Sequence, residues 1–232
     1  MSFTGVVVAM RMEARSLGGR GTAVTDRVEA GGRMRIQLAG IGPRRAEAAA
    51  QALVEGGARA LVSWGIAVAL DPDLARGALL LPETVIDSGA HFATDSSWRN
   101  ILRARLKTLH PCPAALLQTQ RILDTPEAKS RARSLSGAAA ADMESGPVGR
   151  VAAAAGLPFV AIRAVADRAS DKLPIVLDAE YRWRAGTLLR DIARHPAHIA
   201  ALVSAGIGFG AAHRTLTRVA ARLDAGLGAP VR

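Results

Sequence analysis

The chain has 232 residues and a mass of 24.1 kDa, a size that one compact domain can accommodate. Half of its residues are apolar and 22% are charged, which excludes an intrinsically disordered chain. The net charge is +10, but only 3% of the residues are aromatic and no nucleic-acid-binding motif occurs, which argues against a nucleic-acid partner.

Apolar, β-branched stretches alternate along the chain with alanine-rich segments of helical periodicity. The predicted strands are Phe3–Met10, Arg33–Ala39, Arg59–Trp64, Gly77–Ile86, Ala114–Gln120, Ala138–Met143 and Pro158–Val165. The predicted helices are Pro43–Glu55, Ser96–Leu109, Pro126–Leu135 and Ser145–Ala155, with proline near a helix start and glycine after a helix end as boundary signals. This alternation predicts an α/β domain whose largely parallel sheet is covered by helices on both faces.

The segment from Gly186 to the C-terminus differs from the rest of the chain. Apolar residues recur there at helical spacing, and Pro196 is expected to separate two helices, the second weakened by three glycines between residues 206 and 210. Arg214, Arg218 and Arg222 lie four residues apart and would share one helix face. Two interpretations remain open: a helix that closes the sheet and exposes a basic face, or a helix that lies on a membrane surface.

The sequence also predicts the compartment. No uncharged apolar run reaches the roughly 18 residues that a membrane-spanning helix needs. The N-terminus lacks the pattern of a secretory signal, and the single cysteine, Cys112, excludes an intrachain disulfide. We therefore expect a cytoplasmic protein.

Several common enzyme motifs are missing from the sequence. It contains no GxxxxGK[ST] loop, no GxSxG elbow and no HExxH helix, and its five histidines do not have metal-ligand spacing, so neither a metal nor a cofactor is expected. The segment Gly40–Arg44 follows a strand and opens a helix. It predicts either a tight turn or a loop that faces an anionic ligand.

Three acidic residues follow predicted strands. Glu13 comes after the first strand, Glu144 after the sixth and Asp167 after the seventh. If the sheet is parallel, these carboxylates gather at one edge, where ligands bind to open α/β sheets. Carboxylates held close together separate their pKa values, so that one can donate a proton while another activates water.

The surroundings of these acids resemble a known family. Four segments carry the resemblance: Ala9-Met10-Arg11-Met12-Glu13, Gly40-Ile41-Gly42, Asp142-Met143-Glu144-Ser145 and Ala164-Val165-Ala166-Asp167. Over residues 3–172 they are similar to the nucleoside phosphorylase and methylthioadenosine/S-adenosylhomocysteine nucleosidase superfamily. Within it, Ser63-Trp64-Gly65-Ile66-Ala67, Leu70-Asp71-Pro72 and the arginine-rich tail resemble the hopanoid-associated phosphorylases, which act as adenosylhopane nucleosidases.

The resemblance implies a fold. It implies a single nucleoside phosphorylase-like α/β domain over residues 1–232, with a mixed, largely parallel sheet flanked by helices. The core is expected at residues 3–172 and a basic helical tail at residues 181–225.

The resemblance also implies residue roles. Glu13 matches the acid that positions and activates the attacking water, and Asp167 matches the residue that protonates the purine ring nitrogen or hydrogen-bonds to it. Glu144 matches the residue that binds the ribose hydroxyls, with Met143 packed on the sugar. Further substrate contacts are expected at Gly65, Ile66, Ile122 and Leu123.

One loop departs from the family pattern. The nucleosidases have a Gly-Ser-Ala-Gly-Gly type loop where this chain has Gly65-Ile66-Ala67-Val68-Ala69, and the Arg-Gly-Ser phosphate loop of the phosphorylases is absent. Hydrolysis is therefore expected rather than phosphorolysis, although Arg44 or Arg45 could hold an anion.

The expected function is release of adenine from a 5′-substituted adenosine, with adenosylhopane as the substrate. The expected partners are this lipid-linked nucleoside, a second copy of the chain in a homodimer, and the inner membrane surface in transient contact. The alternatives are a methylthioadenosine/S-adenosylhomocysteine nucleosidase, a purine nucleoside phosphorylase, and a non-catalytic purine- or lipid-binding protein.

Overall fold

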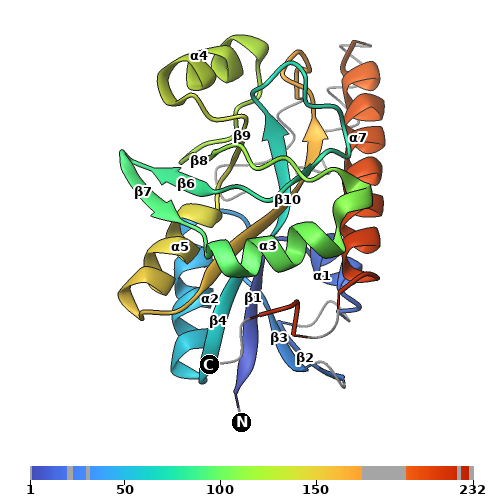
Figure 1. The fold of residues 1–232 in the computed structure, drawn as a ribbon. Helices are drawn as coiled ribbons and strands as arrows, with labels where there is room; N and C mark the ends of the chain where they lie inside the picture. Colours follow the sequence, from blue (N-terminus) through green and yellow to red (C-terminus); the bar gives the residue numbers. More distant parts are fainter. Residues whose placement is uncertain (1, 20–22, 30–31, 174–196, 224–225, 230–232) are drawn as a thin grey trace.

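A computed structural model describes residues 2–19, 23–29, 32–173, 197–223 and 226–229 of the chain (Figure 1). They form a single α/β domain in which helices flank a mixed sheet, as the sequence predicts. The arrowheads of the two longest central strands point towards the end of the molecule where helix α4 (Pro126–Ser136) lies.

The described strands form one sheet in the order β2-β3-β1-β4-β9-β8-β6-β7; β10 also pairs with β4, and β5 pairs with β10. Their bounds are β1 Phe3–Val8, β2 Val24–Glu29, β3 Gly32–Leu38, β4 Ala58–Ala69, β5 Leu79–Leu80, β6 Thr84–Asp87, β7 Ala90–Ala93, β8 Leu116–Gln118, β9 Ala140–Asp142 and β10 Phe159–Asp167. β4 runs parallel to β1 and β10, but its last two residues pair with β9 in the antiparallel direction.

Helices cover both faces of this sheet. The helices besides α4 are α1 Arg11–Ser16, α2 Pro43–Glu55, α3 Ser96–Arg105, α5 Ser145–Ala154 and α7 Ala197–Ala220, with a short 3-10 helix at Lys107–Leu109. Side-chain caps define two of the helix starts: Asp95 accepts a hydrogen bond from the backbone N–H of Trp98, and Thr125 accepts one from Ala128.

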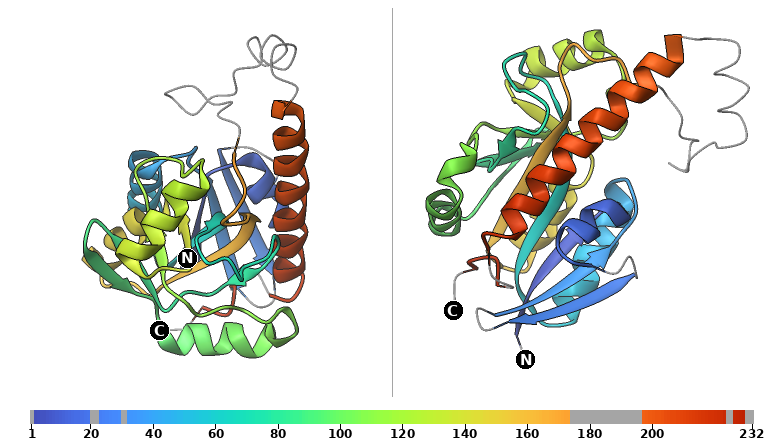
Figure 2. Two further views of the ribbon diagram at one scale, coloured as in Figure 1. Left: turned by 90° about the horizontal axis from the view of Figure 1, so that it is seen from above. Right: turned by 90° about the vertical axis from the view of Figure 1, so that its right-hand side faces the viewer.

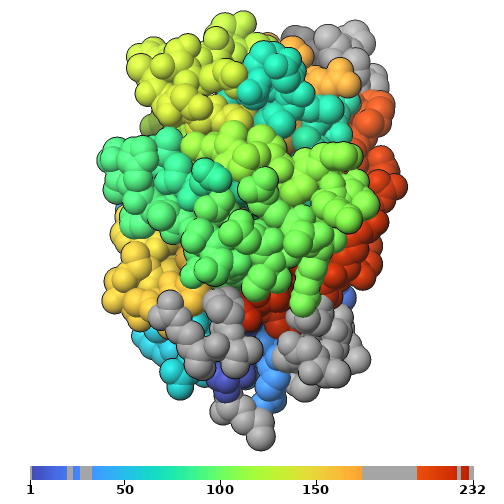
Figure 3. Space-filling view, viewed as in Figure 1, coloured from blue at the N-terminus to red at the C-terminus, as the bar shows by residue number. Residues whose placement is uncertain are grey.

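The core has two main layers, one on each side of the sheet. Apolar side chains of α1, α3 and α7 pack with one set of strand residues, and those of α2 and α5 pack with the other set. β10 is buried along its whole length, so that alternate residues enter opposite layers. In the space-filling view α3 and the β6–β7 hairpin cover the front, with α7 along one side (Figure 3).

The structure corrects several predicted elements. The predicted strand Gly77–Ile86 is two short strands, β5 and β6, separated by Pro82, and the predicted strand Arg59–Trp64 extends to Ala69. Strands β2 and β7 and helix α1 were not predicted. β2 and β7 are hairpin partners at the sheet edge, and their side chains lack the apolar alternation of a half-buried strand.

The C-terminal segment also differs from its prediction. The predicted first tail helix and Pro196 lie outside the described residues. The second is one continuous helix, α7, which passes through Gly206, Gly208 and Gly210 without interruption. It packs along β10 and beside α1 (Figure 2).

The inner face of α7 belongs to the core. Ala212, Leu216 and Val219 are fully buried against the sheet, whereas Arg214, Arg218 and Arg222 are exposed. The helix therefore closes the sheet and exposes a basic face, as one of the two interpretations predicted. None of the helices in the described part of the chain is long and apolar enough to cross a membrane.

Candidate active site

A cavity of about 640 Å³ opens at the end of the sheet towards which β4 and β10 point. Its walls are mostly apolar, and its acidic residues come from four separate segments. The lining residues include Met10, Glu13, Ile41, Ile66, Val68, Arg121, Ile122, Leu123, Asp124, Asp142, Met143, Glu144, Asp167, Leu173, Gly206 and Phe209. The cavity therefore combines an apolar wall with a small number of carboxylates, as is typical of a small-molecule site.

Glu13 lies in α1, directly after β1, and is almost fully buried. One carboxylate oxygen, Oε2, accepts hydrogen bonds from the backbone N–H groups of Ala9 and Met10, both at 2.8 Å. The other, Oε1, accepts one from Ile66 at 3.0 Å. Burial raises the pKa of Glu13, and Arg163 and these three N–H groups oppose the rise.

Glu144 follows β9 and is also buried. Its Oε1 accepts a hydrogen bond of 3.0 Å from the backbone N–H of Gly42, at the start of α2. The loop Gly40–Arg44 therefore does bind an anionic group, but this group is a carboxylate of the same chain. The pKa of Glu144 is raised to about 7: burial raises it most, Arg163 opposes the rise, and the neighbouring carboxylates of Asp142 and Glu13 contribute to it.

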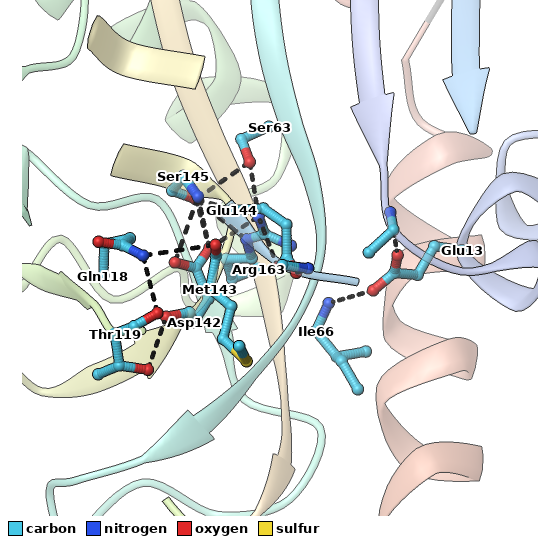
Figure 4. A network of polar contacts seen from close by, with 12 residues as sticks. Glu13, Ser63, Ile66, Gln118, Thr119, Asp142, Met143, Glu144, Ser145 and Arg163 are labelled. Atoms are coloured by element: carbon cyan, nitrogen blue, oxygen red, sulfur yellow. Dashed lines mark hydrogen bonds and ion pairs between the residues drawn. The ribbon is translucent and has the colours of Figure 1, made fainter. Parts of the chain in front are cut away.

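Arg163 lies in the middle of buried strand β10, beside Asp142 and Glu144 (Figure 4). Its Nη2 forms an ion pair with Asp142 at 2.7 Å and lies 4.0 Å from Glu144 Oε2. The hydroxyl groups of Ser63 and Ser145 accept further hydrogen bonds from the guanidinium group. One buried guanidinium group thus offsets part of the negative charge of the cavity.

Asp167 is the last residue of β10. Burial raises its pKa to about 6, and its ion pair with Lys129 opposes this rise. Two carboxyl groups of the cavity, those of Glu144 and Asp167, therefore titrate near neutral pH. Such groups can exchange protons with a bound molecule.

Comparison of the sequence with known families gives a match to the phosphorylase superfamily over residues 10–195. The chain belongs to the phosphorylase superfamily. The expectation that it is an enzyme of this superfamily is confirmed. None of the curated proteins matches the sequence.

Solved structures of other proteins share the fold. Futalosine hydrolase of Helicobacter pylori strain 26695 superposes with a TM-score of 0.75 at 15% identity, over 95% of this chain and 96% of that chain. The 5′-methylthioadenosine/S-adenosylhomocysteine nucleosidase from Neisseria meningitidis, in complex with methylthio-immucillin-A, superposes with a TM-score of 0.72 at 18% identity. This second match covers 96% of this chain and 98% of that chain.

Most of the predicted site residues of this superfamily member lie together. Glu13, Ile66, Ile122, Leu123, Met143, Glu144 and Asp167 all line the cavity. Gly65 does not line it but lies behind it. A Cβ atom at Gly65 would lie 2.2 Å from Arg163 Nη1 and 2.4 Å from Glu13 Oε1, so only glycine leaves room for these two charged groups.

The acids converge by a route that differs from the predicted one. Glu13 and Asp167 follow parallel strands, as expected, but β9 runs antiparallel to β4. β9 pairs with the C-terminal end of β4 and runs in the opposite direction. Glu144, which follows β9, therefore lies at the cavity although its strand is antiparallel to β4.

Four further residues of the site were not predicted from the sequence: Ser63, Lys129, Ser145 and Arg163. Arg163 had a signal: a single charged residue inside the otherwise apolar run Phe159–Ala166 has to be paired when the strand is buried. Lys129 also had one, because it is one of only three lysines in a chain rich in arginine. For Ser63 and Ser145, no feature of the sequence indicates a role in the site.

Proposed function

We propose that this protein is an N-ribosyl hydrolase that releases adenine from a 5′-substituted adenosine, with adenosylhopane as the substrate. The observation that carries the proposal is the meeting of Glu13, Glu144 and Asp167 in one cavity, at the positions where the superfamily resemblance puts its functional acids. We further propose a homodimer, on the resemblance alone.

In the proposed reaction, Glu13 and Asp167 act on opposite sides of the bond that breaks. Glu13 accepts a proton from a water molecule whose oxygen bonds to the anomeric carbon of the ribose. The bond between this carbon and the purine breaks, and its electron pair leaves with the base. Asp167 gives a proton to a ring nitrogen of the purine, so that the base leaves without a full negative charge.

The proposed ribose site consists of Glu144 and Met143. Glu144 Oε2 is not the atom that Gly42 contacts, so it can accept hydrogen bonds from the ribose hydroxyls. Met143, beside it in the cavity wall, presents a flexible apolar side chain to the sugar.

The charge of the cavity favours water over phosphate as the nucleophile. Among its described lining residues, Glu13, Asp124, Asp142, Glu144 and Asp167 are acidic, and Arg121 is the one basic residue. A phosphate dianion would meet like charges and would have to lose its hydration shell. We therefore propose hydrolysis.

The apolar surface near the cavity supports a lipid-linked substrate. Ile41, Val68, Leu173 and Phe209 contribute to the cavity wall, and each Å² of hydrocarbon buried there is worth about 25 cal/mol. On the outer side of α7, Val203 and Ile207 are 56% and 57% exposed. They precede Arg214 and Arg218 on the same helix face, a combination of apolar and basic residues that suits an anionic membrane surface.

The test is adenine release from adenosylhopane, measured with and without phosphate. We expect release that does not depend on phosphate. Strict dependence on phosphate would replace hydrolysis with phosphorolysis.

The second candidate is a nucleosidase for small thioether nucleosides. It is favoured by the superposition on an enzyme named for 5′-methylthioadenosine and S-adenosylhomocysteine. Fast cleavage of these compounds, with no preference for the lipid-linked nucleoside, would select it. Binding of adenine without any turnover would instead indicate a non-catalytic binding protein.

A further inference from the structure

Lys129 is a fully buried cation that the proposed mechanism does not use. It lies in α4, and its side chain has no exposed surface. The ammonium group donates to three oxygens: it forms an ion pair with Asp167 Oδ2, and it contacts the carbonyl oxygens of Arg168 and Asp171, each at 2.8 Å. All three of its N–H bonds are therefore satisfied.

The surroundings hold this ammonium group in place. Asp171 Oδ2 accepts hydrogen bonds from Arg76 Nε and Nη2 at 3.0 and 2.7 Å, and from the backbone N–H of Arg168 at 2.7 Å. Arg76 also donates to Ser204 in α7. Lys129 thus lies where α4, the end of β10 and the loop after it meet, and this loop is tied to α7.

The choice of lysine at this position is informative. The chain uses arginine almost everywhere and contains only three lysines. A planar guanidinium group places its donors in a fixed fork, whereas an ammonium group directs three N–H bonds towards separate oxygens around one point. The three oxygens around Lys129 match the ammonium geometry.

We infer that Lys129 is a positioning residue for Asp167: it holds Oδ2 in place, leaves Oδ1 for the purine, and stabilises the carboxylate that forms when the proton passes to the leaving base. The inference rests on the proposed function. The O–H bond of Asp167 breaks, an N–H bond of the purine forms, and the negative charge left on Asp167 lies against a cation already in place. A preorganised charge of this kind lowers the barrier because it needs no reorganisation during the reaction.

The test compares two substrates in the variants K129M and K129R. Adenine needs a proton in order to leave, whereas para-nitrophenolate leaves from its riboside without one. In K129M we expect kcat for the adenine nucleoside to fall by about 10²-fold or more, with hydrolysis of para-nitrophenyl riboside close to the wild-type rate. K129R, which keeps the charge, should recover part of the nucleoside activity. The matched control is R133M, which removes a partly exposed ion pair with Asp71 from the same helix and should leave both activities unchanged.

The pH profile gives a readout that a purely structural role would not move. The charged groups that face Asp167 are Lys129 from α4, Asp171 from the following loop and Arg76 from the segment before β5. Because Lys129 lowers the pKa of Asp167, its loss in K129M should move the alkaline limb of kcat to higher pH. In K129R the limb should stay close to its wild-type position.

Two outcomes would overturn the inference. One is that K129M loses activity on both substrates to the same extent, and the other is that the alkaline limb of its kcat–pH profile stays at the wild-type pH. If K129M does not fold, the double variant K129M/D167N removes both charges and leaves neither unpaired. Its nucleoside activity should equal that of D167N alone, and a further loss would count against the inference. If the wild-type protein cleaves no nucleoside at all, the proposed function fails instead.

Discussion

The carboxyl group of Asp167 lies at the end of a strand that is buried along its whole length, and its environment balances two opposing effects. Burial raises its pKa to about 6, and the ammonium group of Lys129 limits the rise. An acid with a pKa near the working pH is protonated often enough to donate a proton and is strong enough to release it. This balance suits the proposed role in leaving-group protonation.

Replacing Asp167 with Asn should abolish turnover of adenine nucleosides while leaving the fold intact. Asn cannot deliver a proton to the purine, and loss of a general acid typically lowers the rate by about 10²–10⁴-fold. The measurement is kcat for adenine release, with circular dichroism as the control for folding. A D167N variant that retains most of the wild-type rate would remove Asp167 from the mechanism.

Replacing Glu144 with Gln should stabilise the protein at high pH. The pKa of Glu144 is about 7 in the folded state, against 4.5 as its ordinary value, so its stabilising contribution is present below about pH 4.5 and is lost as the pH rises through 7. Gln does not ionise, so E144Q should exceed the wild-type free energy of unfolding by roughly 3 kcal/mol at pH 8 and should equal it at pH 4.

Urea unfolding of E144Q and the wild-type protein at these two pH values checks this. Asp167 remains in both proteins, so each should still lose some stability as the pH rises. An equal free energy of unfolding at pH 8 would show that Glu144 ionises there without cost.

E144Q should also lose more activity on ribonucleosides than on 2′-deoxyribonucleosides, because the proposed contacts are to the ribose hydroxyls.

At the scale of elements, α7 shows why a glycine-rich segment can still form a long helix. Glycine lowers helix propensity by about 1 kcal/mol relative to alanine, which led to the prediction of a weakened helix. Gly208, however, lies against β10, where a Cβ atom would be 1.8 Å from the carbonyl oxygen of Ala166. The close approach of α7 to the strand that carries Asp167 therefore requires glycine at this position.

The glycines of α7 provide a matched pair of variants. G208A should destabilise the protein by about 1–3 kcal/mol, because the new methyl group pushes α7 away from β10. G206A has no neighbour within 4 Å of the new methyl group and should be neutral, or stabilising by up to about 1 kcal/mol. Thermal unfolding of both variants is the measurement. Equal stability of the two would show that α7 can shift freely on the sheet.

At the scale of the whole molecule, the position of α7 gives it two faces with different surroundings. Ala212, Leu216 and Val219 belong to the core, so deletion of the segment would expose the sheet. On the outer side, Val203, Ile207, Arg214 and Arg218 follow one another at spacings of four, seven and four residues, which places them on one helix face. Point variants can therefore test the outer face without removing the helix.

The protein should bind vesicles that contain anionic lipid, and R214Q/R218Q should weaken this binding. Each arginine near an anionic surface contributes about 1 kcal/mol. Co-sedimentation at low and high salt is the measurement, and binding should fall with salt because surface charges are screened within about 8–10 Å at physiological ionic strength.

The control for this experiment is R103Q/R131Q, which removes the same charge from exposed positions on α3 and α4 and should bind like the wild-type protein. No binding by the wild-type protein at low salt would refute the membrane contact. Weakening by the control variant to the same extent would show that net charge alone drives the binding.

Local patterns in the sequence were sufficient for the class of fold, the order of most elements and the positions of Glu13, Glu144 and Asp167. These follow from apolar periodicity, from proline and glycine at helix ends and from acids just after apolar strands, all of which are properties of neighbouring residues. Strands β2 and β7 were not predicted, because edge hairpins bury too little surface to impose that periodicity.

Only the tertiary structure decided the direction of β9, the continuity of α7 and the partners of the buried cations. Arg163 meets Asp142 and Lys129 meets Asp167 across 21 and 38 residues of sequence. The effect of each cation on the pKa of an acid depends on distance and burial, which no local pattern encodes. The sequence therefore predicted three of the acids that line the cavity, and the packing of distant elements determined which cations balance their charge.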